Sequence, residues 1–355
     1  MGVPEKIQTW QMVEPGKLAK TSIDVPELKE GEVLVEVAGC GVCHTDVGYF
    51  YDGVPTVNKP PLTLGHEISG KVVAGVENLL GKEVIVPAVM PCNKCEICKM
   101  GRGNRCLAQK MPGNSMGIYG GFSSHIPVPS EDLCIIEDRG DMPLEHLSVV
   151  ADAITSPYQA AKRADIQEGD LVLITGATGG IGVYMTQIAA AMGAKEVISI
   201  ARNKEKLERS LEYGATHAIS TLDKSSKDIR NDFRAYCKEK GLPNYGWKIF
   251  ECSGSKAGQE ISLEILSFIG KMLVVGYGMH RVEYMFSRLM AFDAEVIGTW
   301  GCLPGYYPEV LEMVMQDKIK VSPLVELRPM SQIEQAFKES HSGKLLKRVI
   351  LVPDF

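Results

Sequence analysis

Four cysteines share one short stretch of the chain, PCNKCEICKMGRGNRC, with two, two and seven residues between them. This spacing lets four thiolates surround one tetrahedral cation, and zinc prefers such a ligand set. No histidine or carboxylate is needed to complete the shell, so the site would be closed and structural. An iron–sulfur cluster and four unrelated buried thiols are the alternatives. We therefore expect a structural zinc bound by Cys92, Cys95, Cys98 and Cys106.

A second group of metal-ligand types lies earlier in the chain. Cys43 occurs in GVCHTD, and His66 and Glu67 occur in GHE. A catalytic zinc keeps three protein ligands and one open position, so Cys43 and His66 would need a third ligand. Taken alone, these two residues are better explained as a buried thiol and a hydrogen-bonded core histidine.

A glycine-rich turn, GATGGIG, occupies residues 176–182, directly after the apolar run LVLIT and before the helical pattern IGVYMTQIAAAMGA. In this context glycines let backbone amides and a helix N-terminus approach a pyrophosphate. The pattern predicts a dinucleotide-binding unit. The expected cofactor contacts are Gly176, Thr178, Gly179, Gly180, Ile181, Gly182, Arg202, Lys206 and Val275.

The elements that must position these residues follow two different patterns. Short β segments broken by glycine and proline dominate the first third and predict an antiparallel, loop-rich domain; they are residues 32–42, 68–76 and 82–89. From about residue 154, strands alternate with helical stretches, which predicts βαβ units and a doubly wound parallel sheet. Its expected strands are residues 171–175, 196–201, 248–251, 272–276 and 295–298.

The last part of the chain has a third pattern. Two helical segments, 306–318 and 329–340, the second with an N-cap signal at Ser331, precede a closing strand within 348–355. We expect these elements to pack on the first domain. The predicted organisation is thus a catalytic domain of residues 1–153 with a zinc lobe at 91–107, a dinucleotide-binding domain of residues 154–301, and a returning segment of residues 302–355.

Composition excludes several classes of protein. The 355 residues are 45% hydrophobic and carry a net charge of −6, so the chain lacks the basic excess of a nucleic-acid binder. No apolar run is long enough to span a bilayer, and Glu5 and Lys6 interrupt the start where a signal peptide would be apolar. We expect a cytoplasmic protein whose ten cysteines stay reduced.

Together, GxCHTD, GHE, the four-cysteine lobe and GxxGGxG resemble the medium-chain zinc alcohol dehydrogenases, in the right order over nearly the whole chain. The resemblance implies an α/β fold with a mainly antiparallel, GroES-like catalytic domain and a Rossmann domain. It implies a catalytic zinc on Cys43 and His66, with Glu67 as an alternate ligand. The implied roles of further residues are proton acceptor for Thr45, orientation of His66 for Asp46, and cofactor phosphate contacts for His44 and Arg348.

Three positions depart from the family pattern. In ADAITSPY, Asp152 stands where a third cysteine ligand is common, as a carboxylate does in polyol-using relatives; a helix N-cap is the alternative role. Gly48 replaces a histidine of the proton relay, so the proton would leave through Thr45, the cofactor ribose and water. Ala201 and Arg202 replace the acidic residue that binds the adenine ribose, so we expect NAD from the resemblance while NADP stays open.

Longer segments resemble a subgroup of this family that oxidises the ring alcohol of a cyclohexenoyl-CoA thioester to the conjugated ketone, in anaerobic benzoyl-CoA degradation. They are PEKIQTWQMV, FYDGVPTV, VIVPAVMPCNKCE, RCLAQKMPGNSMGIYGG, YGWKIFECSGSKAGQE and LMAFDAEVIGTWGCLP. The CoA thioester is expected from this resemblance alone, together with a homo-oligomer, either dimer or tetramer. A generic alcohol or polyol dehydrogenase is the main alternative. A zinc-ribbon interaction protein would leave the glycine-rich unit unexplained.

Overall fold

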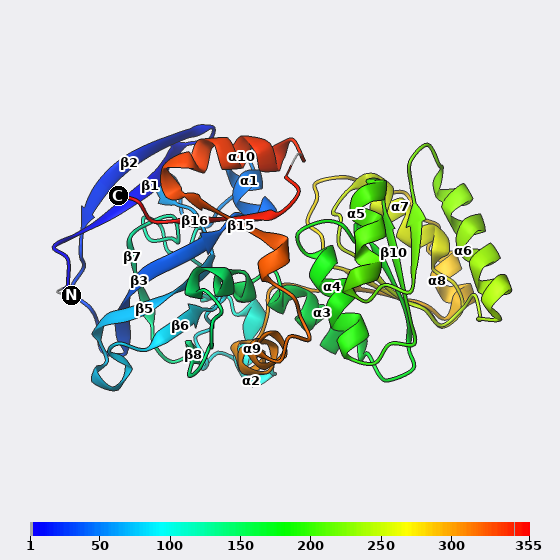
Figure 1. The fold of residues 1–355 in the computed structure, drawn as a ribbon, viewed down its shortest axis with the longest axis horizontal. Coiled ribbons are helices and arrows are strands. Elements are labelled where there is room, and N and C mark those ends of the chain that lie inside the picture. The colour runs from blue at the N-terminus through cyan, green and yellow to red at the C-terminus, as the bar shows by residue number, and fades with distance from the viewer. Residues whose placement is uncertain (1–2, 344) are drawn as a thin grey trace. The chain divides into compact units, whose positions relative to one another are not determined.

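The computed structural model describes residues 3–343 and 345–355, and the chain forms two compact units (Figure 1). The first unit comprises Met1–Thr155, Gly301–Gln316 and Val321–Phe355. The second comprises Ser156–Trp300 and Asp317–Lys320. The chain therefore leaves the first unit, forms most of the second, and returns to the first, with residues 317–320 contributing once more to the second.

The first unit is built mainly of antiparallel strands in two sheets. A three-stranded sheet has the order β2-β1-β4, and a seven-stranded sheet has the order β15-β16-β3-β5-β6-β8, with β7 also paired to β3. The strands are β1 (Lys6–Glu14), β2 (Lys17–Asp24), β3 (Glu32–Gly41), β4 (Leu62–Thr63), β5 (Glu67–Gly75), β6 (Glu83–Val86), β7 (His125–Pro129), β8 (Cys134–Ile136), β15 (Val325–Pro329) and β16 (Arg348–Val352).

The apolar side chains of these strands make the core of the first unit. Valines 33, 35 and 37 of β3 are buried with Phe122, and Phe337 of the returning segment packs edge-on against Phe122. The helices of this unit are α1 (His44–Tyr51), α2 (Glu96–Lys99), α9 (Tyr307–Met315) and α10 (Ile333–His341), with a 3-10 segment, η3 (Leu144–Ala151). The returning segment thus completes a core that the first part of the chain leaves unfinished.

The expected cap at Ser331 is wrong. Gln332 caps α10, because a short 3-10 turn, η7 (Met330–Gln332), precedes the helix. The backbone N–H and hydroxyl of Ser331 instead donate to the carboxylate of Asp354. A tertiary contact to the end of the chain therefore replaces the local capping interaction.

The second unit has a six-stranded, wholly parallel sheet in the order β11-β10-β9-β12-β13-β14. Its strands are β9 (Leu171–Thr175), β10 (Glu196–Ala201), β11 (His217–Ser220), β12 (Lys248–Glu251), β13 (Lys271–Val274) and β14 (Glu295–Gly298). The order reverses between β9 and β12, and ligands of such sheets bind at that switch point, beyond the carboxyl ends of the strands. The predicted fold class is confirmed.

Helices connect successive strands of the parallel sheet. They are α4 (Gly182–Ala191), α5 (Lys204–Arg209), α6 (Ser226–Lys240), α7 (Lys256–Ile265) and α8 (Ser287–Phe292), while α3 (Thr155–Ala164) precedes the first strand, β9. Helix α6 illustrates why they form: Ser225 and Asp228 make a capping box, Gly241 ends the helix with a left-handed φ, and Ile229 and Phe233 face the core. No helix of the described residues is long and apolar enough to cross a membrane.

Candidate metal centres and cofactor site

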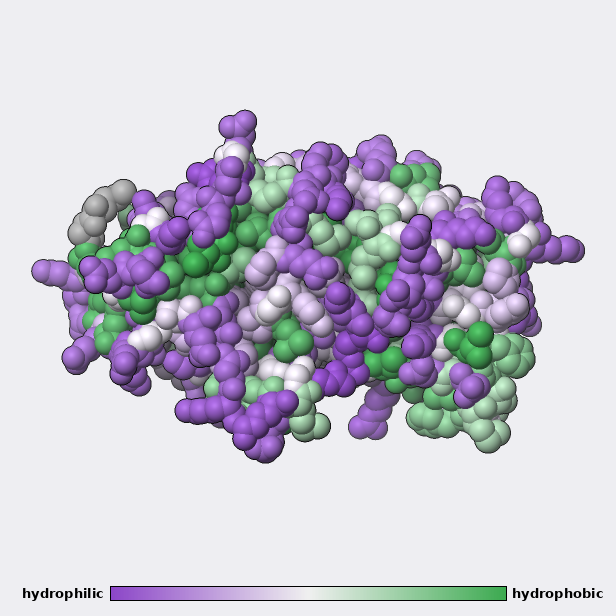
Figure 2. All heavy atoms as spheres, turned by 90° about the horizontal axis from the view of Figure 1, so that it is seen from below, coloured by the Kyte–Doolittle hydropathy of each residue, from purple (hydrophilic) through white to green (hydrophobic). Residues whose placement is uncertain are grey.

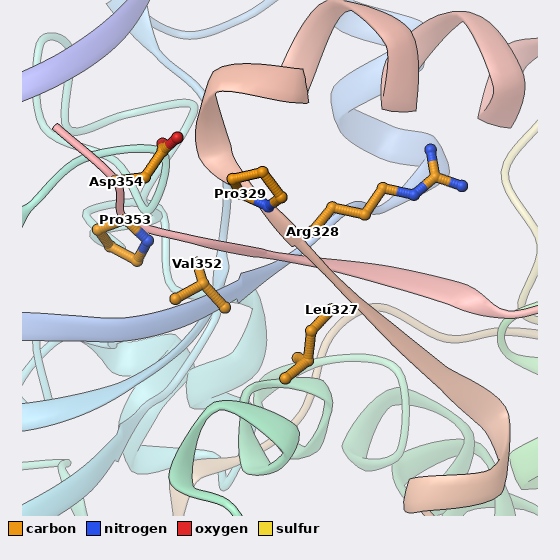
Figure 3. Close-up of a pocket in the computed structure, with 6 residues that line it drawn as sticks. All are labelled: Leu327, Arg328, Pro329, Val352, Pro353 and Asp354. Carbon is orange, nitrogen blue, oxygen red and sulfur yellow. The ribbon is translucent and has the colours of Figure 1, made fainter.

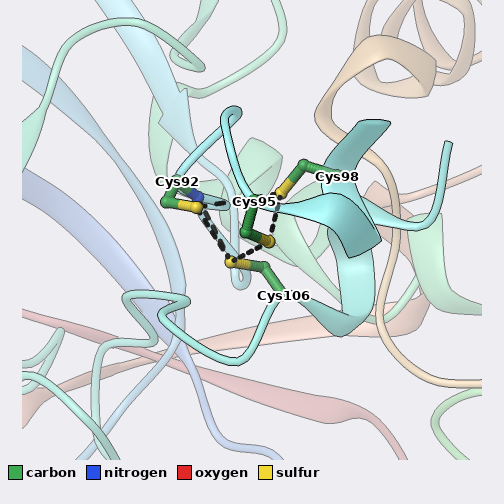
Figure 4. Close-up of side chains that lie close together, drawn as sticks. All are labelled: Cys92, Cys95, Cys98 and Cys106. Carbon is green, nitrogen blue, oxygen red and sulfur yellow. Dashed lines mark hydrogen bonds between the residues drawn. The ribbon is translucent and has the colours of Figure 1, made fainter. Parts of the chain in front are cut away.

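The four cysteines of the lobe converge on one point, with their sulfur atoms facing inward (Figure 4). Their Sγ atoms lie 3.4 Å apart for Cys92 and Cys106, 3.5 Å for Cys95 and Cys98, 3.8 Å for Cys95 and Cys106, and 4.0 Å for Cys92 and Cys98. A tetrahedral ion with zinc–sulfur bonds of about 2.3 Å places its sulfurs about 3.8 Å apart. The cluster therefore has the size of a zinc shell.

The backbone of the lobe also favours a thiolate at Cys92. Amides of Lys94 and Cys95 point at Sγ of Cys92 and lower the pKa of this thiol to about 6. Donors of this kind stabilise the deprotonated sulfur that a metal needs. Both the donor set and its surroundings fit zinc.

A second cluster gathers Cys43, His66, Glu67 and Asp152, whose possible ligand atoms all lie within 4.8 Å of one another. Three different junctions supply them: Cys43 is the N-cap of α1, His66 and Glu67 stand at the start of β5, and Asp152 follows η3. Oδ2 of Asp152 lies 3.7 Å from Sγ of Cys43 and 3.6 Å from Nε2 of His66. A cysteine sulfur, an imidazole and a carboxylate thus face one point, which fits an open zinc site.

The position of Asp152 bears on its alternative role. Asp152 ends η3, with φ −144° and ψ −51°, and α3 begins three residues later at Thr155. The residue is therefore not the N-cap of α3, and its carboxylate points toward the two other ligand types.

Asp46 fixes the histidine of this cluster. Its fully buried carboxylate accepts hydrogen bonds from the backbone of Cys43 and Gly65, and lies 3.2 Å from Nδ1 of His66. A carboxylate accepts, so Nδ1 donates its proton to Asp46, and Nε2 is the ring nitrogen that can ligate a metal ion at the point shared with Cys43 and Asp152. The sequence placed Asp46 beside His66 through the family resemblance, and the geometry agrees with an orienting role.

Glu67 has a partner that the sequence did not indicate. Nε of Arg348 donates to Glu67 Oε2 at 2.8 Å, and Nη2 of Arg348 contacts Oε1 of the same carboxylate. Both side chains are nearly fully buried. Burial raises the pKa of Glu67, and the guanidinium opposes this rise. Arg348, expected at the cofactor phosphates, is thus joined to the metal cluster by a two-pronged ion pair between residues 281 positions apart.

The remaining expected residues of α1 lie in its first turn. Thr45 is partly exposed, and its hydroxyl forms no hydrogen bond within the part of the chain that the structure describes. His44 is exposed, while Gly48 is buried one turn later. Thr45 is therefore open to a substrate hydroxyl, and no side chain at position 48 continues a relay.

The glycine-rich turn has the geometry that a close backbone approach requires. Gly176 has φ +75°, and a Cβ at this position would lie 2.7 Å from the backbone nitrogen of Ser253. A Cβ on Gly182, the first residue of α4, would lie 2.1 Å from the carbonyl oxygen of Gly176. Gly179 and Gly180 are exposed at the tip, and Thr178 and Ile181 are partly exposed beside them.

The other expected cofactor residues lie at the ends of neighbouring strands. Ala201 is buried at the end of β10, Arg202 is exposed, and Lys206 is half-buried in α5. Val275 follows β13 and donates its backbone N–H to the carbonyl of Glu251. No side chain at position 201 accepts a hydrogen bond from a ribose.

A surface pocket lies elsewhere in the first unit, lined by residues of β15 and β16 and those that follow (Figure 3). Its charged groups already have partners, because Arg328 bonds Glu326 and Glu339, and Asp354 bonds Ser331. It contains none of the expected site residues. The clusters of ligand atoms, rather than this pocket, identify the site.

Comparison with known proteins shows the same organisation. A family model for the alcohol dehydrogenase GroES-like domain matches residues 29–138, and one for zinc-binding dehydrogenases matches residues 180–316. A probable D-xylulose reductase A of Aspergillus fumigatus is 31% identical over 340 residues, covering 92% of this chain and 91% of that protein. The chain belongs to the zinc-dependent medium-chain alcohol dehydrogenase family. This confirms the family inferred from the motifs.

More distant members share the full length. A sorbitol dehydrogenase of Halalkalibacterium halodurans is 25% identical over 91% of this chain and 92% of its own. The crystal structure of galactitol-1-phosphate dehydrogenase from Escherichia coli superposes with a TM-score of 0.86 at 25% identity, covering 98% of this chain and 100% of that one. As a member of this family, the chain is an oxidoreductase that acts on CH–OH groups with zinc and NAD(P), which confirms the predicted enzyme class and cofactors.

Proposed function

We propose that the protein oxidises a secondary alcohol held at the Cys43–His66–Asp152 cluster and transfers hydride to NAD. The observation that carries this proposal is the convergence of a thiol, an imidazole and a carboxylate on one point, with the hydroxyl of Thr45 two residues from Cys43. A zinc ion at this cluster supplies Lewis acidity that lowers the pKa of the substrate hydroxyl.

The residues of the chain divide the remaining work. Cys43, His66 and Asp152 would hold the metal, and Asp46 fixes the ring of His66 so that Nε2 would be directed at it. The hydroxyl of Thr45 would accept the proton of the substrate hydroxyl, and, since Gly48 offers no relay group, the exit toward a bound ribose and water is part of the proposal. Arg348 holds the carboxylate of Glu67 near the cluster as an alternate ligand.

The nicotinamide dinucleotide binds, in this proposal, at the glycine-rich turn and the ends of β9, β12 and β13. Gly176, Thr178, Gly179, Gly180, Ile181 and Gly182 approach the pyrophosphate, with Lys206 and Val275 nearby. We also propose His44 as a phosphate contact, as the family resemblance implies. We propose NAD as the nucleotide, with Arg202 stacking on adenine or facing water; a 2′-phosphate on Arg202 would instead favour NADP.

As substrate we propose 6-hydroxycyclohex-1-ene-1-carbonyl-CoA, oxidised to the 6-oxo enone in anaerobic benzoyl-CoA degradation. Support comes from the six long segments that resemble that subgroup; two of them include Cys92, Cys95 and Cys106 of the zinc lobe, but most of their residues lie outside the general metal and cofactor motifs. The ring alcohol would lie at the metal cluster, and the CoA handle would extend outward. Binding energy from the handle would align the ring carbon with the nicotinamide, so shortening the thioester should lower turnover as well as raise KM.

A polyol is the second candidate substrate. The relatives at 25% to 31% identity include proteins named D-xylulose reductase and sorbitol dehydrogenase, and these names favour a polyol over a thioester. Asp152 suits either substrate, because it belongs to the metal cluster rather than to a substrate-recognition surface.

One substrate panel separates the two candidates. Purified zinc-loaded protein is given the CoA thioester, xylitol, sorbitol, ethanol or benzyl alcohol, each with NAD and with NADP, and reduced nicotinamide is followed by absorbance. We expect the highest kcat/KM for the thioester with NAD. A higher kcat/KM for a polyol would establish the second candidate, and a large preference for NADP would reject the proposed nucleotide.

We also propose that the protein forms a homo-oligomer through the second unit. Strand β14 is the edge of the parallel sheet and is largely exposed. Large exposed apolar side chains occur between residues 268 and 296, including Met285, Phe286 and Met290, and Figure 2 shows hydrophobic side chains gathered on the surface of this unit. An exposed edge strand flanked by apolar side chains suits pairing with a second copy of the chain.

A further inference from the structure

Glu251 is a buried carboxylate that the proposed reaction does not use. It is the last residue of β12, and no part of its side chain is exposed. Among the residues that the structure describes, no lysine, arginine or histidine forms an ion pair with it. Burying an unpaired carboxylate is unfavourable unless hydrogen bonds replace water, so its partners indicate why it is there.

Those partners all belong to the loop that follows the strand. Oε1 of Glu251 accepts from the backbone N–H of Ser253 at 2.8 Å, from the Ser253 hydroxyl at 2.5 Å, and from the N–H of Gly254 at 3.1 Å. Burial raises the pKa of Glu251, while these donors oppose the rise. The carboxylate thus fixes the conformation of residues 252–254.

This loop in turn contacts two turns expected to bind the cofactor. Gly176 lies against Ser253 so closely that a Cβ would come within 2.7 Å of the Ser253 nitrogen. Gly276 lies against Gly254, where a Cβ would come within 2.2 Å of the nitrogen. The carbonyl of Glu251 also accepts the N–H groups of Val275 and Gly276, at 3.0 and 2.8 Å. Glu251 and the loop after it therefore contact both the Gly176 turn and the Val275 turn, which lie 99 positions apart in the sequence.

The position of Glu251 in the sheet explains why it contacts both turns. Strand β12 lies between β9, which leads into the Gly176 turn, and β13, which leads into the Val275 turn. It also adjoins the switch point between β9 and β12, where parallel sheets bind nucleotides. Cys252 continues the link by donating its backbone N–H to the carbonyl of Thr175 at the end of β9.

We propose that Glu251 is a positioning residue for the nicotinamide dinucleotide. Through the 252–254 loop it holds the glycine-rich turn and the Val275 turn at the separation that the bound nucleotide requires. This inference rests on the proposed function, because it assumes that the nucleotide binds at this edge. It adds a residue that touches neither nucleotide nor substrate.

The direct test is Glu251→Gln, which keeps the shape and replaces one acceptor oxygen with an NH2 group. We expect NADH affinity, measured by fluorescence titration, to fall roughly tenfold because donors then face a donor. The matched control is Glu264→Gln: Glu264 lies in α7 of the same unit and bonds Arg230 and Arg288, so its loss should lower the melting temperature and leave NADH affinity unchanged. NADH affinity of Glu251→Gln within about twofold of wild type would overturn the proposal.

A milder variant covers a failure of Glu251→Gln to fold. Ser253 is exposed, and Ser253→Ala removes the hydroxyl donor to Glu251, together with the two hydrogen bonds of that hydroxyl to Ser255, while the backbone donors to Glu251 remain. We expect NADH binding about threefold weaker with the melting temperature and zinc content of the wild type; unchanged binding would reject the role of Glu251. If the wild type binds neither NADH nor NADPH, the proposed function itself fails, which distinguishes the two outcomes.

Discussion

At the scale of single residues, the chemistry depends on side chains that sequence motifs identify and on partners that they do not. Asp152 could be compared with a ligand position because a recognisable segment, ADAITSPY, surrounds it. The pairing of Glu67 with Arg348 could not be predicted from the sequence, because the two residues lie 281 positions apart and meet only when β16 pairs with β3. The spacing of residues in a motif indicates local geometry, whereas a contact between residues far apart in the sequence can be identified only once the fold is known.

Asp152→Ala tests the third ligand. Without the carboxylate, the Cys43–His66 pair is an incomplete shell, so zinc content should fall by about one ion per chain and turnover by roughly a hundredfold or more. Metal analysis with steady-state kinetics measures both. Asp141→Ala, an exposed carboxylate of the same unit, should change neither. Full zinc content and full turnover in Asp152→Ala would show that Asp152 is not a ligand.

Arg348→Ala tests the buried ion pair. Removal of the guanidinium leaves Glu67 buried without its countercharge, so the free energy of unfolding should fall by about 3 kcal/mol. Urea titration of the zinc-loaded protein gives this value. Arg328→Ala, which breaks a pair with the more exposed Glu326 and Glu339, should cost less. Equal losses for the two variants would contradict the importance given to burial.

At the scale of secondary-structure elements, the local sequence pattern was sufficient to predict an element when residues of that same segment determine its structure. The strands expected at 171–175, 196–201 and 248–251 occur as β9, β10 and β12, because continuous apolar runs suit a sheet covered on both faces. The start of α10 was misplaced because Ser331 bonds Asp354, a tertiary contact that the local sequence does not contain. The role proposed for Glu251 was also missed, although a carboxylate directly after the apolar residues Ile249 and Phe250 of β12 was a visible signal.

The metal site of the zinc lobe can be tested separately from the Cys43–His66–Asp152 cluster. Cys98→Ser should cost one zinc per chain, leave the catalytic zinc in place, and lower the melting temperature by on the order of 5 °C, because metal binding stabilises such a lobe. Metal analysis and thermal unfolding measure these effects. Cys237→Ser, at a buried thiol of α6 outside both clusters, should release no zinc. Two zinc ions remaining in Cys98→Ser would exclude a four-cysteine site.

At the scale of the whole molecule, the edge of the parallel sheet predicts association. Replacing Phe286 and Met290, both more than three-quarters exposed, by glutamate should convert the oligomer to monomers without loss of zinc. Light scattering after size-exclusion chromatography gives the mass. Val57→Glu alters an equally exposed apolar side chain of the first unit and should leave the oligomer intact. A wild type that elutes as a 38.8 kDa monomer would exclude the proposed association.

Alcohol oxidation by zinc-assisted hydride transfer is the central claim, and an isotope experiment tests it most directly. The wild type is incubated with NAD and with 6-hydroxycyclohex-1-ene-1-carbonyl-CoA that carries deuterium at the carbinol carbon, and the nicotinamide product is analysed by mass spectrometry. We predict one deuterium in the NADH formed, loss of the product when zinc is chelated, and its return when zinc is restored. Absence of deuterated NADH from the zinc-loaded protein, with this alcohol and with equally labelled polyols, would contradict the account.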